Sequence, residues 1–109
     1  MDRIYNKLVR DKIPEIIKAK SEEPVTKELS LDEYKLALEI KLKEECQEVI
    51  AAGGEDRIEE IADALEVLKA LAKLENASLE DVIAVADKKS ASRGAFEKRI
   101  FLEKVISSK

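Results

Sequence analysis

Four carboxylates lie in two matching pairs near the middle of this 109-residue chain. Glu45 is followed three residues later by Glu48, and Glu60 is followed three residues later by Asp63. On a helix, residues three apart share a face, with about 5–6 Å between their Cβ atoms. Two facing helices would therefore gather four anions, and a hard cation would offset their repulsion. Mg²⁺ takes oxygen ligands and keeps positions for water and substrate phosphates. The spacing predicts a Mg²⁺ site that handles a phosphate compound, with Mn²⁺ as a substitute ion.

Two helices joined by a glycine turn are expected to carry these pairs. Ser30 and Glu33 match a capping box, so the first helix should span residues 30–52. Gly53-Gly54 ends it, and the second helix should span residues 55–76. A shorter helix should begin near Pro14. A further helix should follow Ser78, direct Val82 and Val85 inward, and break at residues 91–94.

Apolar residues of the first long helix fall on one stripe when they are plotted at 100° per residue. The stripe consists of Leu31, Tyr34, Leu38, Leu42 and Val49. Glu45 lies inside this stripe and Glu48 flanks it. Because a charged group directed at a core is costly without a partner or a metal, Glu45 is unlike an ordinary surface glutamate.

The second long helix is apolar over more than half of its circumference. One face carries Ile58, Ile61, Ala62, Leu65, Leu68 and Ala72, and Val67, Leu71 and Leu74 widen it. A helix of this kind is buried on two sides. We therefore expect the stripe of Val67, Leu71 and Leu74 to form a subunit interface, which would place Glu60 and Asp63 near a partner.

Composition limits the class of protein. Charged residues make up 40% of the chain, while Gly and Pro are scarce, which favours an all-α fold in a single domain spanning residues 1–109. The net charge of −4 and the few aromatic residues argue against a nucleic-acid polymer as partner. A lone cysteine, no signal peptide and no long apolar run predict a cytoplasmic protein without a membrane partner. Histidine is absent, so carboxylates remain as the acid–base groups near neutral pH.

Basic residues gather toward both ends of the chain. Lys7, Arg10 and Lys12 lie in a short segment before the first helix, and Arg93, Lys98 and Arg99 lie near the other end. One interpretation is that they bind substrate phosphates, with Arg10 and Arg93 ranked first. The alternative is that they form ordinary surface salt bridges. In the same C-terminal segment, apolar residues are expected to form a packing tail: Phe96, Ile100, Phe101 and Val105.

The two carboxylate pairs resemble the signature of the all-α nucleoside triphosphate pyrophosphohydrolases, the MazG-type group. Residues 5–14 (YNKLVRDKIP) and 93–102 (RGAFEKRIFL) resemble the flanks of short members described as phosphoribosyl-ATP pyrophosphohydrolase-like. With the carboxylate pairs between these two flanks, the resemblance extends over nearly the whole chain. The chain departs from the pattern in a short loop between the pairs and in Gly94-Ala95, where two glycines are expected.

The resemblance implies an oligomeric, four-helix-type bundle, dimeric or tetrameric, that uses Mg²⁺ to split a nucleotide between its α- and β-phosphates. The products would be a nucleoside monophosphate and pyrophosphate, in a house-cleaning role. The residues carried over as metal ligands are Glu45, Glu48, Glu60 and Asp63, and Glu44 or Glu45 would orient or deprotonate the attacking water. The competing hypothesis is a non-catalytic helical module for regulation or assembly, in which the acidic cluster is a salt-bridged surface.

Overall fold

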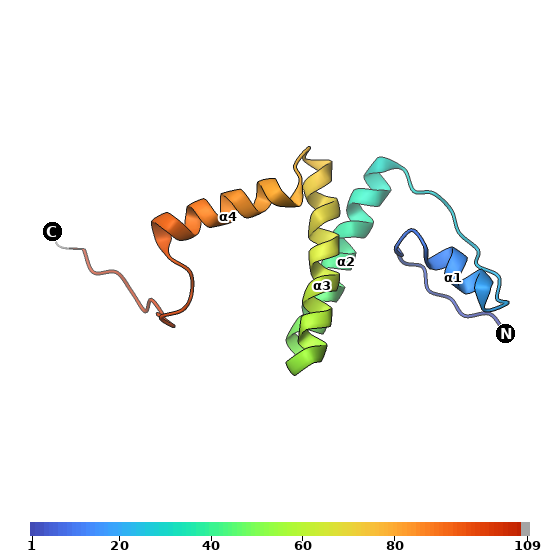
Figure 1. Ribbon diagram of the computed structural model, residues 1–109, viewed down its shortest axis with the longest axis horizontal. Helices are drawn as coiled ribbons and strands as arrows, with labels where there is room; N and C mark the ends of the chain where they lie inside the picture. Colours follow the sequence, from blue (N-terminus) through green and yellow to red (C-terminus); the bar gives the residue numbers. More distant parts are fainter. Residues whose placement is uncertain (108–109) are drawn as a thin grey trace. The chain divides into compact units, whose positions relative to one another are not determined.

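The computed structural model describes residues 1–107, and these residues form helices without any strand (Figure 1). The four helices are α1 (Ile13–Ala19), α2 (Leu31–Ala51), α3 (Gly54–Leu74) and α4 (Leu79–Arg93). The all-α prediction is therefore confirmed. The chain divides into two compact units, Met1–Ser78 and Leu79–Lys109.

Helices α2 and α3 form an antiparallel pair within the first unit (Figure 1). The predicted capping box starts α2: the Glu33 backbone N–H donates to Ser30 Oγ at 3.2 Å, and the Ser30 N–H donates to Glu33 Oε1 at 2.9 Å. The Ser30 backbone N–H, and after it the Ser30 hydroxyl, stabilise the Glu33 carboxylate and lower the pKa of Glu33. At the far end, Gly54 adopts a φ of +58°, a left-handed conformation that glycine tolerates best. The chain thus reverses within two residues.

The core of the first unit lies between α2 and α3. Leu38 and Val67 are buried there, with exposed fractions of 3% and 7%. Besides Leu38, the predicted α2 stripe contains four half-buried residues: Tyr34, Leu42, Glu45 and Val49. Leu31 is the exception, since it lies at the first residue of α2 and remains exposed. The stripe therefore predicts the inner face of α2 except at its first turn.

The prediction that Val67, Leu71 and Leu74 of α3 face a partner subunit is wrong. Val67 is buried and Leu71 and Leu74 are half-buried, so this stripe serves the intramolecular core. The exposed apolar residues of α3 belong to the other face: Ile58, Ile61, Leu65 and Leu68. Periodicity identifies two apolar faces, but the packing of α2 decides which one is covered.

The second unit contains α4 and the segment that follows it. Helix α4 continues to Arg93, past the start of the break expected at residues 91–94, and ends where Gly94 adopts a φ of +83°. Val82 and Val85 do not face inward as expected but are exposed, and so is the expected packing tail of Phe96, Ile100, Phe101 and Val105. Several large apolar side chains of this unit are therefore exposed.

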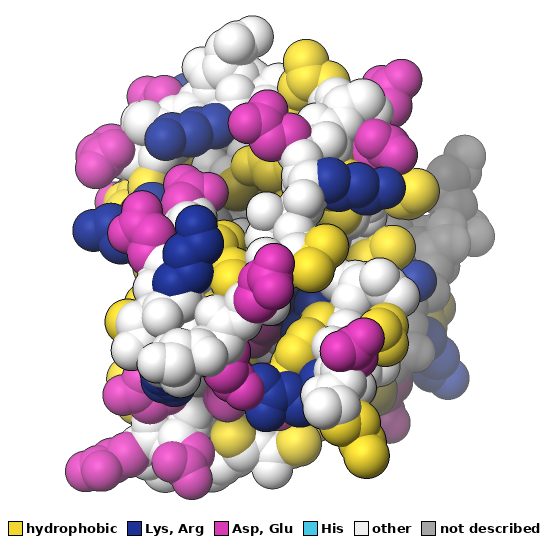
Figure 2. Space-filling model, turned by 90° about the vertical axis from the view of Figure 1, so that its right-hand side faces the viewer, with side chains coloured by type: hydrophobic (Ala, Val, Ile, Leu, Met, Phe, Trp, Pro, Cys, Tyr) yellow, Lys and Arg dark blue, Asp and Glu magenta, His cyan; other side chains and the backbone are white. Residues whose placement is uncertain are grey.

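Surface composition is mixed. Figure 2 shows hydrophobic side chains interspersed among acidic and basic ones on one face of the molecule. None of the described helices is both long and apolar enough to cross a membrane.

Candidate metal centre

Three carboxylates from the two central helices converge. Glu45 of α2 and Glu60 and Asp63 of α3 each offer an oxygen atom, and these oxygens all lie within 4.8 Å of one another. All three side chains are half-buried. We refer to Glu45, Glu60 and Asp63 as the carboxylate cluster. It joins one member of the first predicted pair with both members of the second.

Two members of the carboxylate cluster have basic partners. Arg10 Nη2 donates to Asp63 Oδ1 at 2.6 Å, across 53 positions of sequence. Lys41 Nζ lies 3.8 Å from Glu45 Oε1, one helical turn away on α2. The Lys41–Glu45 pair is not among the contacts predicted from the sequence, although its i,i+4 spacing is a recognised signal for a helical ion pair.

Glu60 carries a perturbed carboxylate. Its pKa is raised, first because partial burial removes water from the charged form, and then by repulsion from Glu48, Asp63, Glu45 and Asp56. Crowded carboxylates of this kind favour either a proton or a cation. A divalent ion would offset the same repulsion that raises the pKa.

Glu48 and Glu44 lie at the margin of the site. Glu48 is exposed and is not among the three converging carboxylates, although its charge acts on Glu60. Glu44 is half-buried on α2 beside Glu45. The structure therefore brings three of the four predicted ligands together and leaves Glu48 as a neighbouring charge.

The remaining basic candidates fall in two places. Lys7 and Lys12 are exposed in the irregular segment that also carries Arg10. Arg93, Lys98 and Arg99 are exposed and belong to the second unit. Of the six predicted phosphate-binding residues, Arg10 is the one that the structure connects with the carboxylate cluster.

The carboxylate cluster fits a hard divalent cation. Its donors are all oxygens, as Mg²⁺ requires, and two oxygens on opposite sides of a Mg²⁺ ion lie about 4.2 Å apart. Small side-chain rotations would bring oxygens now within 4.8 Å to that separation. Three carboxylates would also leave positions for water and phosphate oxygens.

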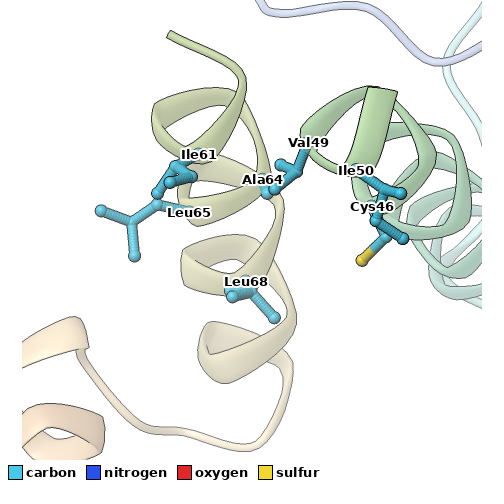
Figure 3. Close-up of a pocket in the computed structure, with 7 residues that line it drawn as sticks. All are labelled: Cys46, Val49, Ile50, Ile61, Ala64, Leu65 and Leu68. Atoms are coloured by element: carbon cyan, nitrogen blue, oxygen red, sulfur yellow. The ribbon is translucent and has the colours of Figure 1, made fainter. Parts of the chain in front are cut away.

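An apolar groove also lies between α2 and α3. It has a volume of about 350 Å³. In Figure 3, Val49 and Ala64 lie between the helices, with other residues on either side. The residues that line the apolar groove are Cys46, Val49, Ile50, Ile61, Ala64, Leu65 and Leu68.

Comparisons with known proteins give a partial relative. No family model matches the chain, and no solved structure matches it. A protein of Mycolicibacterium smegmatis (strain ATCC 700084 / mc(2)155), described as an uncharacterized protein, is 53% identical over 49 residues. The match covers 45% of this chain and 50% of that protein. The chain thus matches about half the length of this relative.

Proposed function

We propose that the chain is a Mg²⁺-dependent nucleotide pyrophosphohydrolase that releases a nucleoside monophosphate and pyrophosphate. The observation that carries this proposal is the convergence of Glu45, Glu60 and Asp63 within 4.8 Å. The three carboxylates come from two different helices, and this also supports the proposal. An accidental pair on one solvated helix face would not meet a carboxylate from the next helix. The resemblance of the carboxylate pairs and both flanks to the MazG-type group supplies the reaction type.

The residues of the carboxylate cluster would hold the ion and fix its position relative to the substrate. A bound Mg²⁺ ion would neutralise phosphate charge and raise the nucleophilicity of water. Glu44, half-buried one residue before Glu45, would accept a proton from the attacking water or orient it. Glu45 is the alternative for this role. Glu48, exposed nearby, would serve as a further ligand after a change of rotamer.

Basic side chains would bind the substrate's phosphates. Arg10 is the first candidate because it already reaches Asp63, and a guanidinium pairs with phosphate through two parallel hydrogen bonds. Lys7 and Lys12 belong to the same segment. Arg93, Lys98 and Arg99 remain candidates through the resemblance of residues 93–102.

A panel of common and modified nucleoside triphosphates, assayed with and without Mg²⁺, tests the proposal. We expect Mg²⁺-dependent release of pyrophosphate together with the monophosphate, and none from the Asp63→Asn variant. Release of orthophosphate with a diphosphate would contradict cleavage between the α- and β-phosphates. Absence of hydrolysis across the panel would reject the enzymatic assignment.

A non-catalytic module for regulation or assembly is the second candidate. The observation that favours it is the apolar groove, whose members Ile50, Ile61 and Leu65 are at least 40% exposed. An inactive chain that still self-associates through this groove would support the module. We include self-association to a dimer or tetramer in both proposals, since either one leaves the groove to be covered.

A further inference from the structure

Arg10 occupies a position that sequence spacing does not explain. Its segment precedes α1 and forms neither helix nor strand, yet its guanidinium donates to Asp63 Oδ1 at 2.6 Å. Asp63 is also one of the three members of the carboxylate cluster. The same carboxylate is thus the anchor of the N-terminal segment and a candidate metal ligand.

Charge balance in the cluster depends on this contact. Glu45, Glu60 and Asp63 bring three negative charges together. Lys41 lies beside Glu45, and Arg10 lies beside Asp63. Lys41 belongs to the same helix as its partner and contacts it at 3.8 Å, whereas Arg10 comes from a separate segment at hydrogen-bond distance. Arg10 is therefore the cation in closest contact with a carboxylate of the cluster, and an incoming ion would compete with it for Asp63.

We propose that Arg10 is an exchangeable internal cation: it neutralises Asp63 before metal binds, is displaced by the divalent ion, and then pairs with a phosphate of the substrate. This inference rests on the proposed function, because it requires the carboxylate cluster to bind a metal. Its physical basis is competition, since Asp63 cannot offer the same oxygen lone pairs to the guanidinium and the ion at full strength. Displacement is easy because both side chains are about half exposed, and exposed ion pairs contribute little stability.

Once the ion displaces Arg10 from Asp63, the guanidinium would be free to bind a phosphate of the substrate. A guanidinium carries five N–H donors in a planar fork that matches phosphate oxygens. The segment around Arg10 is irregular, so the side chain can move without disturbing α2 or α3. Arg10 is thus a positioning residue for the metal-free site and a binding residue for the phosphate.

Calorimetric titrations of wild type, Arg10→Ala and Arg3→Ala test the proposal. Arg3 is the matched control because its Nη2 forms a 2.7 Å ion pair with Glu22, within the N-terminal part of the chain. We expect Arg10→Ala to bind Mg²⁺ up to about five-fold more tightly, the factor that corresponds to about 1 kcal/mol for an exposed ion pair. With Mg²⁺ present, we expect the same variant to bind inorganic pyrophosphate more weakly than wild type. Arg3→Ala should change neither affinity.

Arg10→Ala is expected to strengthen Mg²⁺ binding and to weaken pyrophosphate binding. These opposite changes distinguish an exchange of Arg10 from a role in which Arg10 only holds Asp63 in place. If Arg10→Ala weakened Mg²⁺ binding, Arg10 would be holding Asp63 in place for the metal, and displacement would be overturned. Unchanged Mg²⁺ and pyrophosphate affinities would overturn it as well. A direct measurement is the NMR signal of the Arg10 Nε–H group, which should shift when Mg²⁺ is added to wild type, while that of Arg3 should not.

Failure of the proposed metal site can be distinguished from failure of the Arg10 exchange. If wild type binds no divalent ion, the metal site itself is rejected, and the exchange with it. If wild type binds Mg²⁺ with an unchanged Arg10 signal, the metal site stands and the exchange is rejected.

Discussion

Within the carboxylate cluster, Glu45, Glu60 and Asp63 differ in their partners. Asp63 forms an ion pair with Arg10 and Glu45 forms one with Lys41, while Glu60 carries a raised pKa from partial burial and from neighbouring carboxylates. These differences give each residue a separate experimental signature.

Removal of a cluster carboxylate should eliminate Mg²⁺-dependent hydrolysis. We expect Glu45→Gln and Asp63→Asn each to lower kcat/KM by at least about 100-fold, because loss of groups that merely support metal ligands already costs 10–100-fold. Circular dichroism should show unchanged helix content, since neither side chain belongs to the buried core. Full activity in either variant would remove that residue from the metal site.

Glu60 should make stability depend on pH in a defined direction. Its pKa is raised above the reference value of 4.5 in the folded chain, so the folded state holds its proton to higher pH than the unfolded state. The stabilising contribution is complete below 4.5 and is lost as pH rises through the folded pKa. Glu60→Gln should therefore have a higher melting temperature than wild type at pH 7 without metal, and the difference should shrink at acidic pH.

The matched control for this experiment is Glu66→Gln, because Glu66 lies on the same helix in an exposed ion pair with Lys69. A saturating concentration of Mg²⁺ should raise the wild-type melting temperature more than that of Glu60→Gln, since a ligand that binds the folded state stabilises it. A Glu60→Gln variant that is less stable than wild type at pH 7 would contradict the repulsion argument.

At the scale of elements, the turn between α2 and α3 sets how the two carboxylate pairs face each other. Gly54 has a φ of +58°, although a Cβ atom there would meet no neighbouring atom, whereas Gly53 has an extended backbone at φ −140°. The requirement for glycine is therefore conformational at Gly54 and absent at Gly53. These adjacent residues form a natural pair of variants.

Gly54→Ala should lower the free energy of unfolding by about 1 kcal/mol, the cost of a left-handed conformation for a residue with a Cβ atom. Gly53→Ala should have no cost and should stabilise by up to about 1 kcal/mol, because alanine restricts the unfolded chain. Urea unfolding at a fixed chain concentration measures both. Equal destabilisation by the two variants would show that the turn does not depend on the conformation of Gly54.

At the scale of the whole molecule, the apolar groove is an exposed apolar surface of the first unit. Its α3 members Ile61, Leu65 and Leu68 are 40–46% exposed, and Ile50 of α2 is 77% exposed. Contiguous exposed apolar surface of this kind is unusual on a soluble monomer. A second copy of the chain can cover it without opposing like charges, since none of the residues that line the groove is charged.

We expect Leu65→Glu to weaken self-association while leaving the fold of the hairpin intact, because Leu65 lies outside the Leu38–Val67 core. Leu36→Glu is the matched control: Leu36 is an exposed leucine of α2, at 59%, that does not line the groove. Light scattering at micromolar concentration measures the change. Leu71→Glu does not test the interface, because Leu71 is half-buried on the α2 side of α3.

Cys46 offers a second measurement of the same interface. It is the single cysteine of the chain, it is exposed, and it lines the apolar groove. A short bis-maleimide should link two chains through Cys46 if two grooves face each other, and Leu65→Glu should prevent the linkage. A monodisperse wild-type monomer that resists cross-linking would reject the groove as an interface.

The sequence by itself determined the local features of this protein. Capping residues and glycines predict the ends of α2 and α3 to within about two residues, because caps and turns depend on neighbouring groups. The three-residue spacing predicts Glu45, Glu48, Glu60 and Asp63 as ligands, since side chains three apart on a helix share a face. The structure brings Glu45, Glu60 and Asp63 together.

The tertiary structure decided which of these local features meet. Periodicity shows that α3 has two apolar faces but carries no information about which one α2 covers, so it assigns Val67, Leu71 and Leu74 to the wrong neighbour. It also could not predict the contact between Arg10 and Asp63, which are 53 positions apart. That contact depends on the path of an irregular segment, and no helical or strand period constrains such a path.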